Sequence, residues 1–347
     1  MKIAILAPPY LPIPPNGYGG VERIVYYLTE GLVKKGHDVT LFAPGDSKVS
    51  SQVFSTFPFS LGNSGEIKNK PYLPLLQYID CFKKASGFDI IHNHAEHMAM
   101  FFADLVTTPV VHTLHSTLVE GETLEEKRKV LLRFKNHNFV SISDNQREGL
   151  KELNFAGTVY NGIDIHKYSY IEKPRGDYLL WVGRITRKKG PLSAIEVAKK
   201  VSIPLVIAAA IDPVEKLFFE EEVKPQIDGK TVSFVGELHG ESLNKLYGNA
   251  LCTLFPITWH EPFGLVMVES MACGTPVIAY RIGSTSEVIE DGVTGFIVDD
   301  LYQMIEAVKN IDKIKRKKCR ERVVEKFTIE KMVNHYEDIY SKLIKKP

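Results

Sequence analysis

The sequence predicts two α/β domains, each built on a doubly wound parallel sheet, and three observations support this. The chain opens with an apolar run, Lys2 to Ala7, then a loop, an amphipathic helix from about Val21, and a second apolar run, Val39 to Ala43. This order, with strands apolar on both faces, is typical of a parallel sheet covered by helices on both sides. The same order begins again at Tyr178 to Val182, after a polar stretch. The length of 347 residues also favours two domains.

Composition narrows the class of protein. A hydrophobic content of 44% supports buried cores, and the net charge of +1 gives no basic field for nucleic acid. The four cysteines are far apart, which indicates buried thiols in a reducing compartment. The first apolar run is too short for a signal peptide, and no run approaches a membrane span. We expect a cytoplasmic protein with no nucleic-acid partner, and peripheral contact with the inner face of a membrane is left open.

The most informative stretch is Pro256 to Tyr280, PITWHEPFGLVMVESMACGTPVIAY. It predicts a loop, a helix from Leu265 to Ala272 that ends before Gly274, and a further strand. Two acids stand out, Glu261 in the loop and Glu269 in the helix. Because the helix is otherwise largely apolar, the Glu269 carboxylate needs a partner such as a hydroxyl group.

Between the two acids, the backbone N–H groups at the start of the helix form a predicted phosphate site. Free N–H groups and the helix dipole both favour an anion there. The order acid, phosphate site, acid corresponds to the sugar hydroxyls, diphosphate and ribose hydroxyls of a nucleotide sugar. For a bare pair of acids, a turn residue and a solvent-facing helix residue would be the more ordinary interpretation. The residues expected at the phosphate site are Phe263, Gly264, Leu265 and Val266.

The segment EPFGLVMVESMACGTPV closely resembles the Glu-x7-Glu segment of the family 4 (group 1) retaining glycosyltransferases. The resemblance covers nearly the whole chain and is strongest in its second half. It implies the GT-B fold, in which two Rossmann-like domains face each other across a cleft. It also implies transfer of a sugar from a nucleotide-diphosphate sugar to a glycan, lipid or small-molecule acceptor, with retention of anomeric configuration. In this reading Glu261 holds the donor sugar hydroxyls and Glu269 the ribose.

A cationic loop, Gly183 to Gly190, follows the first strand of the second half and precedes a helix that opens with Pro191. Arg184 and Lys189 flank this loop at the carboxyl end of a strand, where open α/β sheets bind ligands. Taken alone, they would be ordinary loop cations. The family has Gly-Arg-x4-Lys-Gly here, with both cations on the donor diphosphate, and the match is complete. We expect them to stabilise the leaving diphosphate, so that neither a metal nor another cofactor is needed.

Two glycines, Gly19 and Gly20, lie where the first strand turns into the first helix. They do not complete the dinucleotide fingerprint, because Glu22 stands three positions after Gly19. This argues against an NAD-dependent dehydrogenase. Taken alone, glycines at such a position usually indicate no more than a tight turn. The family has a Gly-Gly pair here, next to the donor phosphate and the acceptor, so the resemblance implies that both glycines contact the donor.

The run His92-Asn93-His94 ends another predicted strand. A metal site is the less favoured interpretation, because a strand end offers no sure third ligand. The family has a similar His-x-His, and the resemblance implies that His94 contacts the donor sugar while His92 is structural. It further implies that the loop with Glu237 and Leu238 lines the nucleotide base.

Two other segments are less informative. Ser284 replaces the second glycine of the family's Gly-Gly-x-x-Glu loop, so the contacts of that loop are not carried over. The basic segment Lys313 to Arg322 is predicted to be a solvated helix.

The run Asn161-Gly162-Ile163-Asp164 matches the family's hinge between domains. We expect an acceptor-side domain over 1–165, a nucleotide-sugar domain over 166–327, and a terminal helix at about 328–347 that packs back on the first domain. Three alternatives remain: a GT-B nucleotide-sugar epimerase, a sugar phosphorylase, and a non-catalytic partner of a glycosyltransferase. A phosphorylase needs a pyridoxal-bearing lysine, which the sequence does not identify. A non-catalytic partner would be expected to lose some of the five principal site residues, and all are present: His94, Arg184, Lys189, Glu261 and Glu269.

Overall fold

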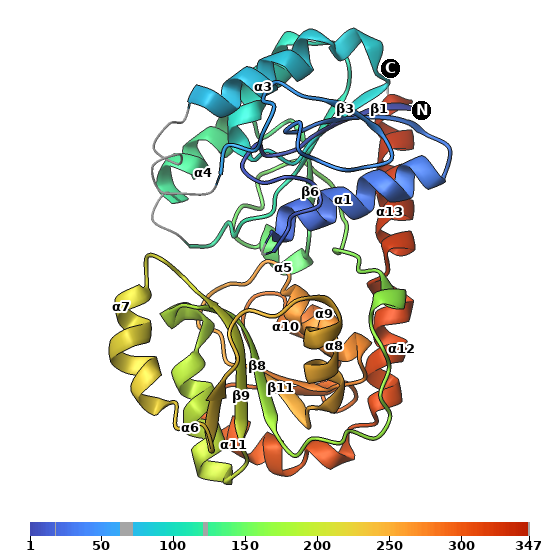
Figure 1. Cartoon of the computed structure of the whole chain (residues 1–347). Helices are drawn as coiled ribbons and strands as arrows, with labels where there is room; N and C mark the ends of the chain where they lie inside the picture. Colours follow the sequence, from blue (N-terminus) through green and yellow to red (C-terminus); the bar gives the residue numbers. More distant parts are fainter. Residues whose placement is uncertain (18, 63–71, 121–123, 346–347) are drawn as a thin grey trace. The chain divides into compact units, whose positions relative to one another are not determined.

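The structure, a computed structural model, describes residues 1–17, 19–62, 72–120 and 124–345 (Figure 1). The chain divides into two compact units. Unit 1 comprises Met1–Gly162 together with Ile329–Pro347, and unit 2 comprises Ile163–Thr328. The chain therefore leaves unit 1, builds the whole of unit 2, and returns to unit 1 for its last helix.

Unit 1 contains a seven-stranded sheet among the described residues, in the order β3-β2-β1-β4-β5-β6-β7, and all its pairings are parallel. The strands are β1 (Lys2–Leu6), β2 (Asp38–Phe42), β3 (Gln52–Phe54), β4 (Ile90–Asn93), β5 (Val110–Thr113), β6 (Asn138–Ser141) and β7 (Phe155–Thr158). The helices are α1 (Gly20–Lys34), α3 (Tyr72–Lys83), α4 (Leu124–Arg133), α5 (Asp144–Arg147) and α13 (Ile329–Ile344), with the 3-10 segments η1 (Ala85–Gly87) and η2 (His97–Leu105).

The two faces of this sheet have different helical covers. Ala4 pairs with Ile91 and Ile5 pairs with His92, and successive side chains along a strand point to opposite faces. Ala4 and Ile91 pack in one core cluster with Tyr78 of α3. His92 lies on the other face, where its ring contacts α13. α3 and α13 therefore cover opposite faces of the sheet.

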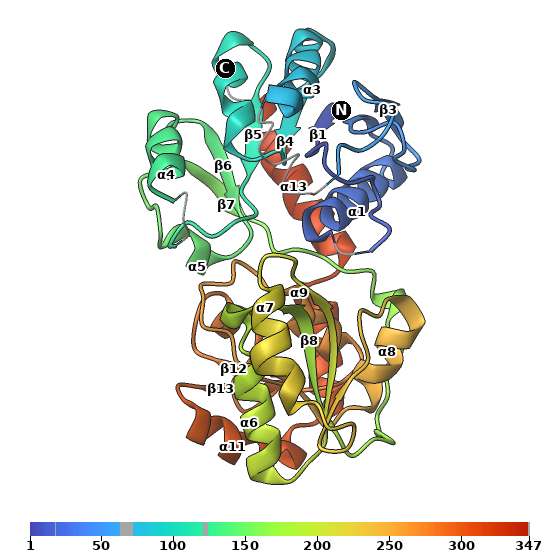
Figure 2. The ribbon, with the colours of Figure 1, turned by 60° about the vertical axis from the view of Figure 1, so that its left-hand side comes forward.

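α13 lies beside α1 in both ribbon views (Figures 1 and 2). The two helices approach closely at Gly31, where an added Cβ would lie 2.4 Å from Cγ2 of Val333. The rim of the contact is polar, because Lys35 donates to Asn334 Oδ1 at 2.8 Å and His37 Nε2 lies 2.9 Å from a carboxylate oxygen of Glu337. The last helix of the chain is thus a structural part of unit 1.

Unit 2 contains a six-stranded parallel sheet in the order β10-β9-β8-β11-β12-β13. The strands are β8 (Leu179–Ile185), β9 (Leu205–Ile211), β10 (Val232–Phe234), β11 (Cys252–Phe255), β12 (Val277–Tyr280) and β13 (Gly295–Val298). The helices are α6 (Pro191–Val201), α7 (Lys216–Phe218), α8 (Gly240–Asn249), α9 (Leu265–Ala272), α10 (Thr285–Val288), α11 (Leu301–Lys309) and α12 (Arg316–Lys326). The shorter segments are η3 (Ile165–Lys167), η4 (Arg187–Lys189), the π-helical η5 (Phe219–Val223), η6 (Lys224–Gln226) and η7 (Ile311–Lys313).

The prediction of a solvated helix over Lys313 to Arg322 is wrong for its three arginines, of which Arg322 donates to the Glu287 carbonyl oxygen at 2.8 Å. Arg316 donates to the carbonyl oxygens of Ile171, Gly248 and Ala250 at 2.7–2.9 Å, and to Thr275 Oγ1. Arg320, one helical turn later, donates to the carbonyl oxygens of Ile165, Tyr168 and Ala272. The spacing of four places both on the buried face of α12. These arginines satisfy backbone carbonyls that loops and helix ends would otherwise leave unpaired.

Ser143 and Asp144 are typical N-cap residues and predict a helix to about Asn154, but the helix that forms is shorter. Ser143 caps it as expected, accepting from the Gln146 N–H at 3.1 Å, but α5 ends at Arg147. Gly149 then lies against the backbone of Leu118, where an added Cβ would be 2.4 Å from the Leu118 carbonyl oxygen. This close approach takes the chain out of the helix.

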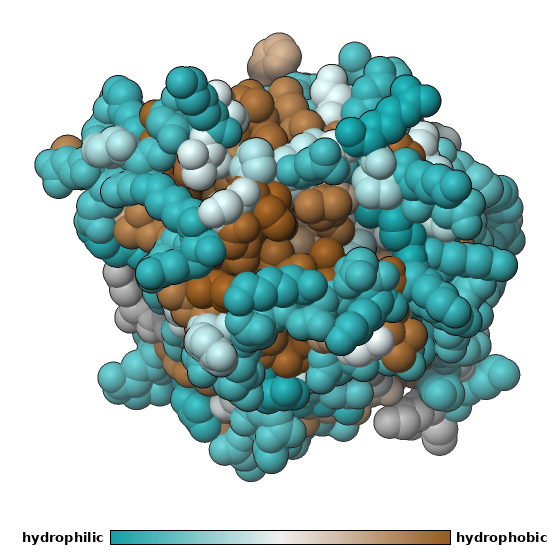
Figure 3. Space-filling view, turned by 90° about the horizontal axis from the view of Figure 1, so that it is seen from below, coloured by the Kyte–Doolittle hydropathy of each residue, from teal (hydrophilic) through white to brown (hydrophobic). Residues whose placement is uncertain are grey.

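No helix among the described residues is long and apolar enough to cross a membrane. On the face shown in Figure 3, apolar side chains gather near the middle and hydrophilic side chains surround them. In unit 2, Val214, Leu217 and Tyr302 are the most exposed large apolar side chains among the described residues. Exposed apolar side chains are common on protein surfaces, so these observations identify no partner by themselves.

Candidate functional site

The loop and helix of the central stretch form as the sequence predicts. α9 spans Leu265–Ala272, the same bounds as the predicted helix. Gly264 precedes it with φ of +79°, and Gly274 follows it with φ of +88°, a conformation that L side chains rarely adopt. The N–H groups of the first helical residues, Leu265 and Val266, have no carbonyl partner within the helix. These N–H groups therefore lie at the start of the helix, where the sequence predicts a phosphate site.

Lys189 and Glu261, far apart in the sequence, form an ion pair. The Lys189 ammonium also lies over the ring of Trp259, 4.8 Å from its centroid. Gly190 makes this approach sterically feasible, because a Cβ there would lie 2.0 Å from the Pro256 carbonyl oxygen. The loops after β8 and β11 are thus in direct contact. The structure brings together the predicted diphosphate cation and the predicted sugar-binding acid.

Arg184 lies on β8 and pairs with an acid that the sequence analysis missed. Its Nη1 donates to Oδ2 of Asp212 at 3.0 Å, and the other Asp212 oxygen accepts from the Val214 N–H at 2.9 Å. Asp212 follows β9, and Arg184 is in register with Ala210 of that strand. The sequence signal that could have identified Asp212 is its position directly after β9, the neighbour of the strand that carries Arg184. Asp212 fixes where the Arg184 guanidinium lies.

Glu269 is buried, as its apolar helix predicted, and its carboxylate has hydroxyl partners. Tyr168 donates to Oε1 at 3.1 Å and Tyr247 donates to Oε2 at 3.2 Å. Burial, followed by the nearby carboxylate, raises the pKa of Tyr247 well above its ordinary value, so this hydroxyl keeps its proton and donates. Neither tyrosine was predicted, because nothing in their local sequence indicates contact with Glu269. The protein itself supplies the partners that the carboxylate needs.

The loop that contains Ser284, which departs from the family pattern, packs against the backbone of Glu261 and stabilises its position. Ser284 is fully buried, its hydroxyl donates to the Phe263 carbonyl at 2.7 Å, and its N–H donates to the Glu261 carbonyl at 3.0 Å. Gly283 has φ of +60°, and a Cβ there would lie 2.5 Å from the Glu261 carbonyl oxygen. The serine therefore holds the loop that carries the predicted sugar-binding acid.

The remaining predicted residue pair of unit 2, Glu237 and Leu238, follows β10 at the same carboxyl edge of the sheet. Glu237 is exposed and its carboxylate lies 3.3 Å from His239 Nε2. Leu238 is half-buried.

In unit 1, the two glycines differ in their surroundings. A Cβ at Gly19 would lie 2.7 Å from the side chain of Pro15 and 3.1 Å from a carboxylate oxygen of Glu22. Gly20 begins α1, and a Cβ there would meet nothing within 4 Å. Internal packing therefore requires a glycine at position 19, whereas Gly20 faces open space. Glu22, a buried acid that the sequence analysis did not single out as a site residue, has its pKa raised by burial.

His94 is fully buried, and both of its ring nitrogens have partners. Nδ1 lies 2.8 Å from His115 Nε2, and Nε2 lies 3.2 Å from His92 Nδ1. Contact with a sugar would therefore require one of these two bonds to open. Among the described residues, no group of three or more His, Cys, Asp or Glu side chains is placed to hold a metal ion.

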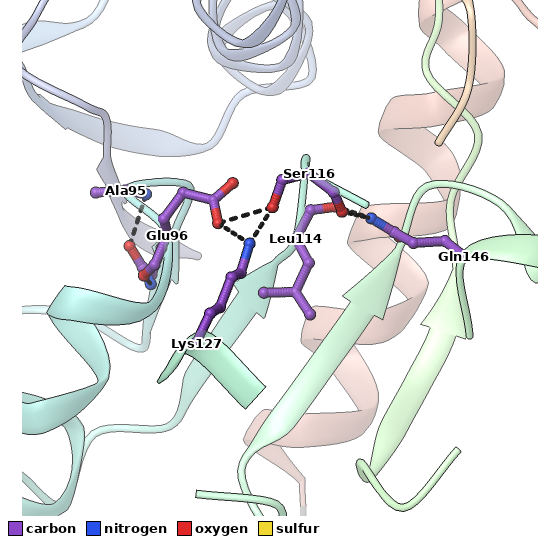
Figure 4. A network of polar contacts seen from close by, with 7 residues as sticks. Ala95, Glu96, Leu114, Ser116, Lys127 and Gln146 are labelled. Atoms are coloured by element: carbon purple, nitrogen blue, oxygen red, sulfur yellow. Dashed lines mark hydrogen bonds and ion pairs between the residues drawn. The ribbon is translucent and has the colours of Figure 1, made fainter. Parts of the chain in front are cut away.

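A polar network that the sequence analysis missed lies past the carboxyl ends of β4 and β5 (Figure 4). Lys127 donates to Glu96 Oε2 at 2.7 Å, and Ser116 donates to the same oxygen at 3.2 Å. Gln146 donates to the Leu114 and Ser116 carbonyls at 2.9 and 2.8 Å. Burial acts to raise the pKa of Glu96, but the Lys127 ammonium together with His115 and His97 outweighs it, and the pKa is lowered. The Glu96 carboxylate is therefore ionised and lies in an ion pair with Lys127.

Both halves of the chain match known glycosyltransferase families. The model described as "Glycosyl transferases group 1" matches residues 164–328, and the model described as "Glycosyltransferase Family 4" matches residues 18–167. The chain is a group 1 glycosyltransferase. This confirms the family that the sequence resembles, and it confirms that the protein is an enzyme of that type.

Relatives of this glycosyltransferase match most of its length. An uncharacterized glycosyltransferase of Methanocaldococcus jannaschii is 26% identical, and the match covers 86% of this chain and 85% of that protein. The phosphatidyl-myo-inositol mannosyltransferase of Mycobacterium leprae is also 26% identical, with 86% and 83% covered. The glycogen synthase of Mycobacterium tuberculosis is 24% identical, with 81% and 79% covered.

Solved structures confirm the fold of this glycosyltransferase. A sucrose-phosphate synthase from Thermosynechococcus elongatus superposes with a TM-score of 0.82 at 22% identity, covering 99% of each chain. The Anabaena protein HepE in complex with UDP-glucose gives a TM-score of 0.74 at 18% identity, covering 99% and 100%. With its two parallel-sheet Rossmann-like units, the chain has the predicted GT-B fold.

Proposed function

We propose that this glycosyltransferase moves a sugar from a nucleoside diphosphate sugar to an acceptor, with retention of anomeric configuration. The observation that carries the proposal is the Lys189–Glu261 ion pair beside the N-terminus of α9. A cation for the diphosphate, an acid for sugar hydroxyls and a helix N-terminus for phosphate belong to two adjoining loops. HepE, a protein of the same fold, binds UDP and UDP-glucose, which supports a nucleotide-sugar donor.

The geometry favours an exchange of partners when the donor binds. The diphosphate takes the place of the Glu261 carboxylate on the Lys189 ammonium, and the released carboxylate accepts from the sugar hydroxyls. Arg184 carries five N–H donors, so it binds a phosphate oxygen while it stays paired with Asp212. As the sugar–phosphate bond breaks, these fixed positive charges stabilise the leaving diphosphate. Glu269 holds the ribose, and Glu237 and Leu238 line the base.

In this mechanism no divalent metal or other cofactor is needed, because Arg184 and Lys189 supply the positive charge. Gly19 and Gly20 lie next to the donor phosphate, and His94 contacts the sugar after one of its two hydrogen bonds opens. No carboxylate acts as a nucleophile, so the acceptor attacks on the face from which the diphosphate leaves. The acceptor is a glycan, a lipid or a small molecule, because relatives named for phosphatidylinositol and for glycogen differ on this point. The four cysteines are buried free thiols, which supports a cytoplasmic location.

A thermal-shift screen of UDP-, GDP- and ADP-sugars tests the donor class. A ligand present at a hundred times its dissociation constant stabilises a protein by about 2.7 kcal/mol, which is readily measured. We expect one base to stabilise the protein, and nuclear magnetic resonance of the product should show the anomeric configuration of the donor. Stabilisation by none of the three, or an inverted product, would contradict the proposal.

Analysis of the reaction products separates the alternatives. An epimerase would change the donor sugar in the absence of any acceptor, and a non-catalytic partner would bind the donor without turnover. Activity should survive treatment with EDTA. Complete loss on chelation, with recovery on addition of magnesium or manganese, would overturn the metal-free mechanism.

A further inference from the structure

A chain of buried polar groups links His94 to the last helix within unit 1. From His94, contacts run to His92 Nδ1, which lies 2.5 Å from the hydroxyl of Tyr340. The other nitrogen of His92 lies 2.7 Å from Thr113 Oγ1. The rings of His92 and His94 are in contact, with centroids 3.9 Å apart. His92, His94, Thr113 and Tyr340 are all at most 1% exposed, so water does not substitute for these partners.

The histidines are neutral in this environment. Burial, followed by neighbouring histidines, lowers the pKa of His92 and of His94 well below the ordinary value. Burial also lowers the pKa of His115 to about 4. A neutral imidazole has one N–H donor and one bare nitrogen that accepts. The partners of each ring therefore determine which nitrogen carries the proton.

Counting donors assigns these protons, beginning at Tyr340. Among the described residues, His92 Nδ1 is the sole hydrogen-bond partner of the Tyr340 hydroxyl. If Nδ1 carried the proton, the phenolic hydrogen would be left without an acceptor in a buried interface, which is costly. The Tyr340 hydroxyl therefore donates to a bare Nδ1. The proton of His92 is then on Nε2 and is donated to Thr113 Oγ1.

The same reasoning continues to His94. Its Nε2 lies 3.2 Å from the bare Nδ1 of His92, and two bare nitrogens facing each other would repel. Nε2 of His94 therefore carries the proton. Nδ1 of His94 is bare and accepts from His115 Nε2–H at 2.8 Å.

We propose that Tyr340 is a positioning residue for His94: acting through His92, its hydroxyl holds the His94 imidazole with the proton on Nε2 and a bare Nδ1 directed at His115. The functional consequence rests on the proposed function. His115 is half-buried, whereas His92 is fully buried, so the bond to His115 is the one that opens for a ligand. His94 then accepts a hydrogen bond from a hydroxyl of the donor sugar through Nδ1.

Nuclear magnetic resonance of the full chain with ¹⁵N-labelled histidine tests the assignment, because ring nitrogens with and without a proton differ strongly in ¹⁵N shift. His94→Gln identifies the His94 signals. In the wild type we expect a protonated Nε2 and a bare Nδ1. Tyr340→Phe removes the donor that fixes His92 Nδ1 as an acceptor, so both tautomers become accessible and the His92 and His94 signals should move towards a mixture of the two. Thr113→Val removes the acceptor of the His92 Nε2–H and should shift them in the same direction.

Tyr78→Phe is the matched control, because it removes a buried phenolic hydroxyl from the opposite face of the same sheet. It should leave the His94 signals unchanged. A wild-type His94 with its proton on Nδ1 would overturn the proposal, whether or not the variants fold. Unchanged His94 signals in a folded Tyr340→Phe protein would overturn it as well.

Turnover separates this proposal from the proposed function. If His94 contacts the sugar, Tyr340→Phe should lower kcat about three- to tenfold and leave KM for the donor nearly unchanged. A shift of the His94 proton without any change in kcat supports the positioning role of Tyr340 and contradicts the contact between His94 and the sugar.

Discussion

The replacement Glu269→Ala tests whether the buried carboxylate binds the nucleotide or only its two tyrosine partners. If it grips the ribose, losing a hydrogen bond to a charged group should weaken nucleoside diphosphate binding by about 1.5–3 kcal/mol. That corresponds to a roughly tenfold to hundredfold rise in the dissociation constant. Titration calorimetry with the nucleoside diphosphate that stabilises the wild type measures this directly.

The same replacement has a structural cost that must be measured separately. It leaves the Tyr247 hydroxyl, which is fully buried, without the acceptor it has at 3.2 Å. An unpaired buried donor costs about 1–3 kcal/mol, so the free energy of unfolding without ligand should fall by this amount. Urea unfolding gives that value.

Tyr247→Phe is the control, since it breaks the same hydrogen bond and keeps the carboxylate. It should change nucleotide affinity far less than Glu269→Ala. If Glu269→Ala lowers stability yet binds nucleoside diphosphate as the wild type does, the carboxylate serves only the two tyrosines. The assignment of Glu269 to the ribose would then be wrong.

Three further outcomes are expected. His94→Ala should lower turnover and leave nucleoside diphosphate affinity nearly intact; a loss of affinity as large as that of Glu269→Ala would refute the division of roles. Arg316→Met, which leaves three carbonyls without their donor, should lower the free energy of unfolding by at least about 3 kcal/mol, whereas Lys317→Met on the exposed side of α12 should change it by less than about 0.5 kcal/mol. The free energy of unfolding should fall as the pH drops from about 6.5 towards 4, because several buried histidines have a lower pKa in the folded protein than in the unfolded chain. Each of them then favours unfolding by up to about 1.4 kcal/mol per pH unit. Equal urea midpoints at pH 7 and pH 5 would refute this. These histidines are His92, His94, His112 and His115, the last two with pKa values of about 3 and about 4.

Elements with local signals could be predicted from the sequence. The bounds of α9 follow from glycines that take positive φ on either side of an apolar run, and neither requires knowledge of distant residues. The buried strands β1 and β8 follow from continuous apolar runs. The need of Glu269 for a hydroxyl partner also follows from its apolar neighbours.

The partners themselves could not be predicted, because they come from other parts of the chain. Tyr168 precedes Glu269 by 101 residues and Tyr247 precedes it by 22, and no spacing rule links them. Arg316 looked like one more residue of a solvated basic run, since composition does not reveal which face of a helix is buried. The bond of His94 to His115 likewise depends on the alignment of β4 with β5, which only the fold determines.

The discontinuity of unit 1 has a consequence for biosynthesis. Tyr340 lies 248 residues after His92, and the whole of unit 2 is translated between them. During translation of unit 2, the His92 face of the first sheet has been synthesised but α13 has not. This apolar and histidine-rich surface therefore stays uncovered until the last helix is made. Unit 2 is contiguous and has all its strands and helices before α13 emerges, so it is able to fold first even though it is encoded second. A released chain that ends at residue 328 should therefore present a protease-resistant second unit and a first unit that chaperones still recognise.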